Sequence, residues 1–269
     1  MRPTFTRTIT ALPTLLRVGV AETVAYRAEF IVWMLTSTMP LINLALWTSV
    51  ADEAPFQQYH SQDFVAYYLG LLIVRNLTGN WVAWQMMEEI RMGVLSMRLL
   101  RPVHPFIAYA CSHIAALPFR SLIALPIAVI LLLSSGASAL TTSPLQLALL
   151  VPSILLAWTM TFGVFYAMGC LGFWMTQAYG IINFYFAVWT IFSGYLLPLD
   201  LLPWHIGSVA KYLPFYSMLG APVDLMTKHL TTAQTLELVA LQGGWAVGLV
   251  ALALLVWRAG IHRFEAVGG

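Results

Sequence analysis

The sequence predicts an all-α membrane protein with six transmembrane helices, and its composition and hydropathy are the observations that predict this class. Of its 269 residues, 60% are hydrophobic and only 9% are charged, whereas a soluble domain carries about 25% charged and about 45–50% apolar residues. The mean hydropathy of +0.80 also indicates a membrane protein rather than a soluble one. Because lipid offers no hydrogen-bond partner to open backbone groups, the spans should be helices, and the alternating pattern of a membrane barrel is absent from the sequence.

The charges and cysteines exclude other classes of protein. The net charge is +2 and the sequence has no long basic tract, so we expect no nucleic-acid partner. Cys111 and Cys170 both lie in apolar stretches. That setting is typical of buried free thiols and gives no support to a disulfide scaffold.

Six segments are long and apolar enough to cross a bilayer, whose core of about 30 Å requires roughly 20 residues of helix. They are Phe30–Val50, Phe64–Met86, Ser121–Leu140 with an amphipathic approach from Pro105, Leu145–Met175 with a possible bend at Pro152, Ala178–Leu197, and Leu236–Trp257. We assign residues 29–269 to one transmembrane domain built on these spans.

Residues 1–28 are expected to form a basic amphipathic helix that lies in the membrane interface. Apolar residues recur there at helical spacing, with arginines spread among them: the apolar set is Ile9, Leu12, Leu16, Val20 and Val24, and the basic set is Arg2, Arg7, Arg17 and Arg27. A cleavable signal would instead have one short apolar core directly behind its basic start. A frayed tail is the alternative interpretation.

The distribution of Lys and Arg predicts the orientation. Nine arginines lie in three segments that six spans place on one side: the N-terminal segment, the loop Gln85–Phe106 and the C-terminus. The other side has only Lys211 and Lys228. We therefore expect a multi-pass protein of a bacterial inner (plasma) membrane, with both termini and the charged loop in the cytoplasm.

The loop Gln85–Phe106 has the pattern of a short amphipathic helix. Glu88 and Arg91 are three residues apart and can pair on a helix surface. Apolar Met92, Leu95 and Leu99 recur on one face, whereas Gly93 interrupts the pattern and prolines end it. Two interpretations remain open: a helix that binds lipid headgroups, or one that docks in a groove of a soluble partner.

Two stretches carry a resemblance to a known family: "EEIRMGVLSMRLLRP" (Glu88–Pro102) and "SGYLLPLDLLPWHIGSVAKYLPF" (Ser193–Phe215). They resemble the membrane subunit of an ATP-binding-cassette exporter of the type-2 permease class, in a little-characterised branch, and the resemblance covers essentially the whole chain. It implies that residues 86–101 form a coupling helix that seats in a cytoplasmic ATPase subunit. The residues implied at that interface are Glu88, Glu89, Arg91, Gly93, Arg98 and Arg101.

The resemblance also implies partners and cofactors. ATP and Mg²⁺ would be bound by the partner ATPase and no cofactor by this chain. A second permease subunit, identical or different, would complete the transporter within the membrane lipid. The substrate is not implied, because this class handles drugs, lipids, polysaccharides and peptides.

Residues 198–232 form neither a full span nor a polar loop. Prolines divide the segment into short pieces, and aromatic residues typical of membrane interfaces accompany them. The resemblance implies re-entrant helices that cap the pathway on the outer side, with Pro198, Pro203, Trp204 and Pro214 at an outer gate. An ordinary interfacial belt is the alternative.

Arg75 is unusual because it lies near the middle of the second span, where an arginine costs about 2.5–3.5 kcal/mol. It could receive an anionic group of the substrate at the subunit interface. It could instead pair with backbone carbonyls, with Asn43 or Asn183, or with an acid of a partner subunit. Tyr185 and Trp189 of the fifth span could line an apolar pathway or face lipid.

No enzyme motif is present. The sequence lacks the phosphate loop G-x-x-x-x-G-K-[ST] and the motifs H-E-x-x-H and G-x-S-x-G, so we expect no catalytic residues and no metal site. We predict a permease subunit that exports a substrate with ATP hydrolysed elsewhere. The rivals are a membrane scaffold and a membrane enzyme for a lipid or lipid-linked substrate, for which His104, His113 and Arg120 are the only candidate groups.

Overall fold

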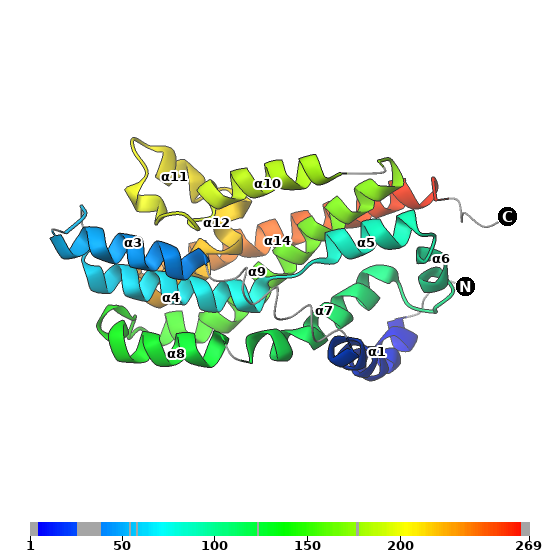
Figure 1. The fold of residues 1–269 in the computed structure, drawn as a ribbon, viewed down its shortest axis with the longest axis horizontal. Coiled ribbons are helices and arrows are strands. Elements are labelled where there is room, and N and C mark those ends of the chain that lie inside the picture. The colour runs from blue at the N-terminus through cyan, green and yellow to red at the C-terminus, as the bar shows by residue number, and fades with distance from the viewer. Residues whose placement is uncertain are drawn as a thin grey trace.

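A computed structural model describes residues 5–25, 39–53, 55–57, 59–122, 124–175 and 178–264. Every regular element in these ranges is a helix, and an isolated bridge between Phe56 and Tyr59 is the only β-type pairing among them. The predicted all-α class is therefore confirmed. The long helices run side by side along the longest axis of an elongated bundle (Figure 1).

Two long helices form the centre of the bundle. Helix α9 (Pro144–Gly169) continues into the 3-10 turn η2 (Cys170–Phe173), and α14 (Thr232–Ile261) packs along it. The combined segment Pro144–Phe173 and the helix α14 have 30 residues each, and both are apolar enough to cross a membrane. A helix of this length is about 45 Å long. They lie where the sequence predicts the fourth and sixth spans.

The segment predicted as the third span is bent. Helices α7 (Pro105–Ser121) and α8 (Ala124–Ser135) meet at an angle of 57°, and only together are they long enough to cross a membrane. The helix α8 ends before the predicted limit at Leu140, and a 3-10 turn, η1 (Ala137–Ala139), follows it.

The prediction of one continuous helix over Phe64–Met86 is wrong. Helix α4 (Ser61–Thr78) ends before Gly79, whose backbone is extended, and α5 (Val82–Arg91) begins after Trp81. Gly and Asn are weak helix formers, and both occur in the break as Gly79 and Asn80. Hydropathy did not reveal the break because it averages over neighbouring residues, and apolar stretches lie on both sides of the few polar residues there.

Two other predicted spans appear as shorter helices. Helix α3 (Met39–Glu53) covers the second part of Phe30–Val50, and residues 30–38 lie outside the described ranges. Helix α10 (Tyr179–Phe192) has 14 residues, about 21 Å of helix, and ends well before the predicted Leu197. The six-span layout therefore remains a prediction.

The N-terminal segment forms the expected helix, α1 (Phe5–Ala25), which packs along α7. Gly19 permits this contact: a Cβ added there would lie 2.9 Å from the Cβ of Ala115. The predicted position of α1 in a membrane interface stays a prediction.

The segment after α10 consists of short pieces, as its prolines predict. They are η3 (Leu199–Leu201), α11 (Ile206–Ala210), α12 (Pro214–Met218) and α13 (Gly220–Thr227). We call residues 198–228 the cap. It includes α11 at one end of the bundle, whereas α6 (Leu95–Leu99) and the last turns of α14 lie at the other end (Figure 1).

Aromatic and methionine side chains fill the interior. Tyr68 and Met160 belong to a buried cluster where α4, α9 and α13 meet, and Phe162 and Tyr166 belong to a second cluster where α5, α9 and α14 meet. Between membrane helices such contacts stabilise through close packing rather than through removal of apolar surface from water.

Candidate functional site

The charged loop forms a helical hairpin rather than the single helix predicted over residues 86–101. It comprises the end of α5, a turn at 92–94 and the short helix α6. Gly93 has a φ of +73°, a left-handed conformation that glycine adopts without the steric cost paid by other residues. The glycine that interrupts the sequence pattern therefore marks the reversal of the chain.

Glu89 and Arg98 close this hairpin from inside. Arg98 donates two hydrogen bonds to the Glu89 carboxylate, one of them from Nη2 to Oε1 at 2.6 Å. The two side chains are only 13% and 12% exposed. Tyr109 of α7 donates to Oε2 of Glu89 at 2.6 Å, and Gln85 donates to Oε1 at 3.0 Å. We call Gln85, Glu89, Arg98 and Tyr109 the clamp, because they join α5, α6 and α7.

The other charged residues of the hairpin lie at the surface. Arg91 donates two hydrogen bonds to Glu88, at 2.6 and 2.7 Å, and both side chains are half-exposed. Arg101 is also exposed. Of the six residues predicted to meet an ATPase, Glu88, Arg91 and Arg101 are thus accessible, whereas Glu89 and Arg98 lie mostly inside the clamp. Their contact with an ATPase stays a prediction.

The turn of the hairpin exposes a set of large apolar side chains that we call the hairpin tip. Its members are Met92, Val94, Met97, Leu99 and Leu100, with exposed fractions from 39% to 80%. Leu95, which the sequence pattern placed on the same face as Met92 and Leu99, is instead fully buried. The helical pattern missed Met97 and Leu100 because the turn at Gly93 changes the direction of the face.

Arg75 lies at the last turn of α4 beside two aromatic rings. Its guanidinium carbon is 4.8 Å from the ring centre of Tyr195 and 5.6 Å from that of Trp189, distances typical of cation–π contacts. Within the described ranges no hydrogen bond or ion pair of its side chain is found. Asn43 donates to the Tyr195 carbonyl at 3.1 Å and so joins this group indirectly.

Among the described residues, neither of the remaining predicted pathway residues forms a hydrogen bond or a ring contact with Arg75. Asn183 is exposed on α10 and is not a partner of Arg75. The Tyr185 hydroxyl lies 3.5 Å from the Met218 sulfur, and its ring packs against Phe215 at a centroid distance of 5.9 Å. Tyr185 therefore joins α10 to the cap.

The predicted outer-gate residues shape the cap. Pro198 directly precedes η3, and Pro214 occupies the first turn of α12, where its missing N–H costs nothing. Trp204, after Pro203, is 88% exposed and has a φ of +56°. Their role as a gate stays a prediction.

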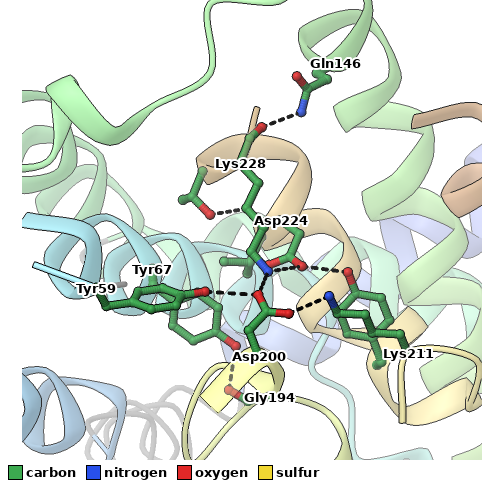
Figure 2. A network of polar contacts seen from close by, with 11 residues as sticks. Tyr59, Tyr67, Gln146, Gly194, Asp200, Lys211, Asp224 and Lys228 are labelled. Atoms are coloured by element: carbon green, nitrogen blue, oxygen red, sulfur yellow. Dashed lines mark hydrogen bonds and ion pairs between the residues drawn. The ribbon is translucent and has the colours of Figure 1, made fainter. Parts of the chain in front are cut away.

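The cap contains an ion cluster that sequence analysis missed (Figure 2). Asp200 pairs with Lys211 at 2.5 Å and also with Lys228, which in turn pairs with Asp224 at 2.7 Å. The side chains of Asp224 and Lys228 are 5% and 22% exposed. Only the spacing of Asp224 and Lys228, four residues apart, could have indicated a pair.

Hydrogen bonds connect this cluster to Tyr59, which precedes α4, and to α9 (Figure 2). Tyr59 donates to Asp200 at 3.2 Å, and Gln146 of α9 donates to the Lys228 carbonyl at 2.8 Å. Burial acts to raise the pKa of Asp200, but the attraction of Lys228 and Lys211 outweighs burial and lowers that pKa to about 2. Asp200 therefore stays ionised at neutral pH, and the hydrogen bonds of Tyr59 and Gln146 fasten the cap to the bundle.

Of the three groups considered for an enzyme, His104 lies apart from the other two. His104 accepts a hydrogen bond from the Phe106 amide at 3.1 Å and caps the start of α7, whereas His113 lies about 13 Å further along that helix. Arg120 donates to the Gly79 carbonyl at the break between α4 and α5. The described part of the chain also has no group of three His, Cys, Asp or Glu residues that could hold a metal.

Comparison with known families identifies the chain. The family model of ABC-2 family transporter proteins matches residues 32–268, a range that includes the hairpin, the cap and both long central helices. A comparison with curated proteins returned no match. The chain therefore belongs to the ABC-2 transporter family and is a multi-pass membrane permease of an ATP-binding-cassette transporter.

Proposed function

We propose that this permease exports a substrate across a bacterial inner membrane, driven by ATP hydrolysed in a separate cytoplasmic ATPase subunit that docks on the hairpin tip. The observation that carries this proposal is the exposed apolar tip on a hairpin whose base is closed by a buried ion pair. Family membership supports the class of partner, because ABC-2 permeases work with an ATP-binding-cassette ATPase.

The composition of the tip suits a protein partner. Exposed apolar patches with a polar rim mark interaction sites. Met92 and Met97 supply flexible side chains that adapt to a partner surface, and Glu88, Arg91 and Arg101 surround them with exposed charges. Such rim charges favour the correct partner and orientation more than they add affinity.

The hairpin is also well placed to transmit movement. Helix α5 packs closely on α9 and η2: a Cβ added to Gly169 would lie 2.9 Å from the Cβ of Met86, and one added to Gly172 would lie 3.2 Å from Ile90 Cδ1. Packed interiors transmit displacement because they contain little free space. A push on the tip would thus reach the central helices rather than bend the hairpin alone, because the clamp holds it.

Arg75 is the candidate contact for the substrate. Its donors are unused within the described ranges, and Trp189 and Tyr195 present aromatic faces beside it. This combination suits a molecule with an anionic group and an apolar body. A second permease subunit would complete the pathway, the outer cap would cover its exit, and ATP and Mg²⁺ would be held by the ATPase.

A pull-down with matched tip variants tests this function. The C-terminally tagged chain is extracted in mild detergent, and co-purifying polypeptides are identified by mass spectrometry. We expect a stoichiometric subunit with a G-x-x-x-x-G-K-[ST] loop, retained by Met97→Leu and lost in Met97→Glu, because a buried unpaired carboxylate opposes docking. Recovery of the same ATPase with Met97→Glu in equal amount would contradict the docking site.

A further inference from the structure

The break between α4 and α5 is surrounded by buried polar atoms that have no hydrogen-bond partner. They are Nδ2 of Asn80, both ring nitrogens of His113, Nε of Arg120 and Oγ of Ser121. Asn80, His113 and Ser121 are 6%, 1% and 5% exposed. Buried polar groups in native proteins are nearly always bonded, so four such residues in one region indicate a group that they bind.

One tryptophan and one hydrogen bond bring His113 and Arg120 to the break beside Asn80, and Ser121 follows Arg120 in the chain. The ring centres of Trp81 and His113 are 4.7 Å apart, and the guanidinium carbon of Arg120 lies 4.8 Å from the ring centre of Trp81. Arg120 also donates to the carbonyl of Gly79, the residue next to Asn80. His113 and Arg120 are seven residues apart, two turns of α7, and so lie on one face of that helix.

The unpartnered atoms are mainly hydrogen-bond donors. Arginine Nε and asparagine Nδ2 can only donate, and serine and histidine can donate as well. The acceptor of Asn80 is already used, because its Oδ1 lies 3.4 Å from the Val82 amide that donates to it. Among the described residues no carboxylate forms an ion pair with Arg120, and arginine cannot lose its proton to relieve the charge. The missing partner should therefore be rich in acceptors and negatively charged.

The surroundings of Arg120 indicate where this partner comes from. The break falls within the predicted second span, and irregular backbone at membrane depth is tolerated where protein or a polar cavity shields it; broken membrane helices commonly form binding sites. Next to Arg120, Phe119 and Leu122 expose 39% and 70% of their surface at the bend between α7 and α8. A cation with exposed apolar neighbours suits an amphiphile whose head is anionic and whose tail remains in the bilayer.

We propose that Asn80, His113, Arg120 and Ser121 bind the phosphate group of a membrane lipid or of a lipid-like amphiphile. The guanidinium group matches the geometry of phosphate oxygens, and the asparagine and serine donors complete the set. The phosphate oxygens would satisfy the donors that the chain leaves unused, and the acyl chains would lie along Phe119 and Leu122. This site is separate from the hairpin tip and does not depend on the proposed docking of an ATPase.

Native mass spectrometry of the purified full chain tests the site. The probes are dioleoyl phosphatidic acid, dioleoylglycerol, which lacks the phosphate, and inorganic phosphate as competitor. We expect phosphatidic acid to bind Arg120→Gln about tenfold or more weakly than the unmodified chain, since hydrogen bonds to charged groups are the stronger class. Arg258→Gln removes an exposed arginine elsewhere and should bind like the unmodified chain. Dioleoylglycerol should not show this dependence on Arg120.

A milder variant keeps the test valid if Arg120→Gln does not fold. Ser121→Ala retains the charge and removes one donor, so it should weaken phosphatidic acid binding about two- to tenfold. Competition by inorganic phosphate would support a site that recognises phosphate from either source, and failure to compete would support a site that also requires the acyl chains. Equal binding of phosphatidic acid to the unmodified chain, Arg258→Gln and Ser121→Ala would overturn the proposal.

Discussion

Arg98 and Glu89 are nine residues apart in the chain, yet they form a two-point ion pair that closes the hairpin between α5 and α6. The same carboxylate accepts the Tyr109 hydroxyl, and the Arg98 guanidinium carbon lies 4.4 Å from the Tyr109 ring centre. The pair therefore fixes the hairpin against α7 and holds the tip in one orientation.

Removal of one member of this pair should destabilise the protein more than removal of both. Glu89→Leu leaves Arg98 mostly buried without its counterion, which costs about 3–5 kcal/mol, whereas Glu89→Leu with Arg98→Met leaves no unpaired charge. Thermal unfolding in detergent measures this difference. Arg91→Met, which breaks the exposed pair with Glu88, is the matched control and should change stability little. A double variant no more stable than Glu89→Leu would contradict the clamp.

The left-handed turn of the hairpin should require glycine. Gly93→Ala places a Cβ at a φ of +73°, which costs about 1–2 kcal/mol. Gly180→Ala is the control, because no atom of another described element lies within 4 Å of a Cβ added to Gly180 of α10, and alanine favours a helix by about 0.5–1 kcal/mol. Melting temperatures should move in opposite directions. An unchanged melting temperature in Gly93→Ala would mean that the turn differs from the one described.

Arg75 should be needed for transport but not for assembly. Arg75→Gln keeps a polar side chain and removes the cation that contacts Tyr195 and Trp189, so transport by the reconstituted complex should fall at least about tenfold, the loss expected for a charge-assisted contact. The control is Asn183→Ala, which changes an exposed polar residue of α10 and leaves the cation in place, so transport should stay close to that of the unmodified complex. Loss of the assembled complex in Arg75→Gln, rather than of transport, would contradict a contact with substrate.

The cap should lose stability in acid through Asp200. Its folded pKa is about 2, below the ordinary value of 3.8, so the stabilisation is present above about pH 4 and is lost as the pH falls towards 2. The difference corresponds to about 2 kcal/mol. Unfolding followed by tryptophan fluorescence should show that Asp200→Asn is less stable than the unmodified chain at pH 7. Its stability should also depend less on pH between pH 4 and 2. Asp52→Asn, at an exposed carboxylate, should retain the acid sensitivity. Equal pH dependence of Asp200→Asn and the unmodified chain would refute this role.

The sequence predicted those parts of the fold that depend on local pattern. Continuous apolar runs located α9 and α14, and prolines divided the cap into short helices. The break at Gly79 was hidden because hydropathy averages over neighbouring residues, and the contact that supports it comes from Arg120, distant in the chain. The pair of Asp200 and Lys228 likewise depends on tertiary structure.

In the candidate site too, features set by local spacing could be predicted, whereas features set by tertiary structure could not. Gly93 and the pair of Glu88 and Arg91 were recognised from spacing, since neighbours on a helix surface can be inferred without a fold. The inward direction of Glu89 and the burial of Leu95 could not be inferred, because both follow from the reversal at Gly93 and from the contact with Tyr109. The exposed Met97 and Leu100 became evident only when the hairpin was seen as two helices.

Site-specific cross-linking tests the docking of an ATPase on the hairpin tip most directly. A photo-reactive phenylalanine analogue replaces Met97 in the tip or Val209, an equally exposed residue of α11 at the opposite end of the bundle. After irradiation of the complex in membranes, the account predicts a cross-link from position 97 to a polypeptide with a G-x-x-x-x-G-K-[ST] loop and none from position 209. A cross-link to that ATPase from position 209, or from neither position in a complex that still co-purifies, would contradict it.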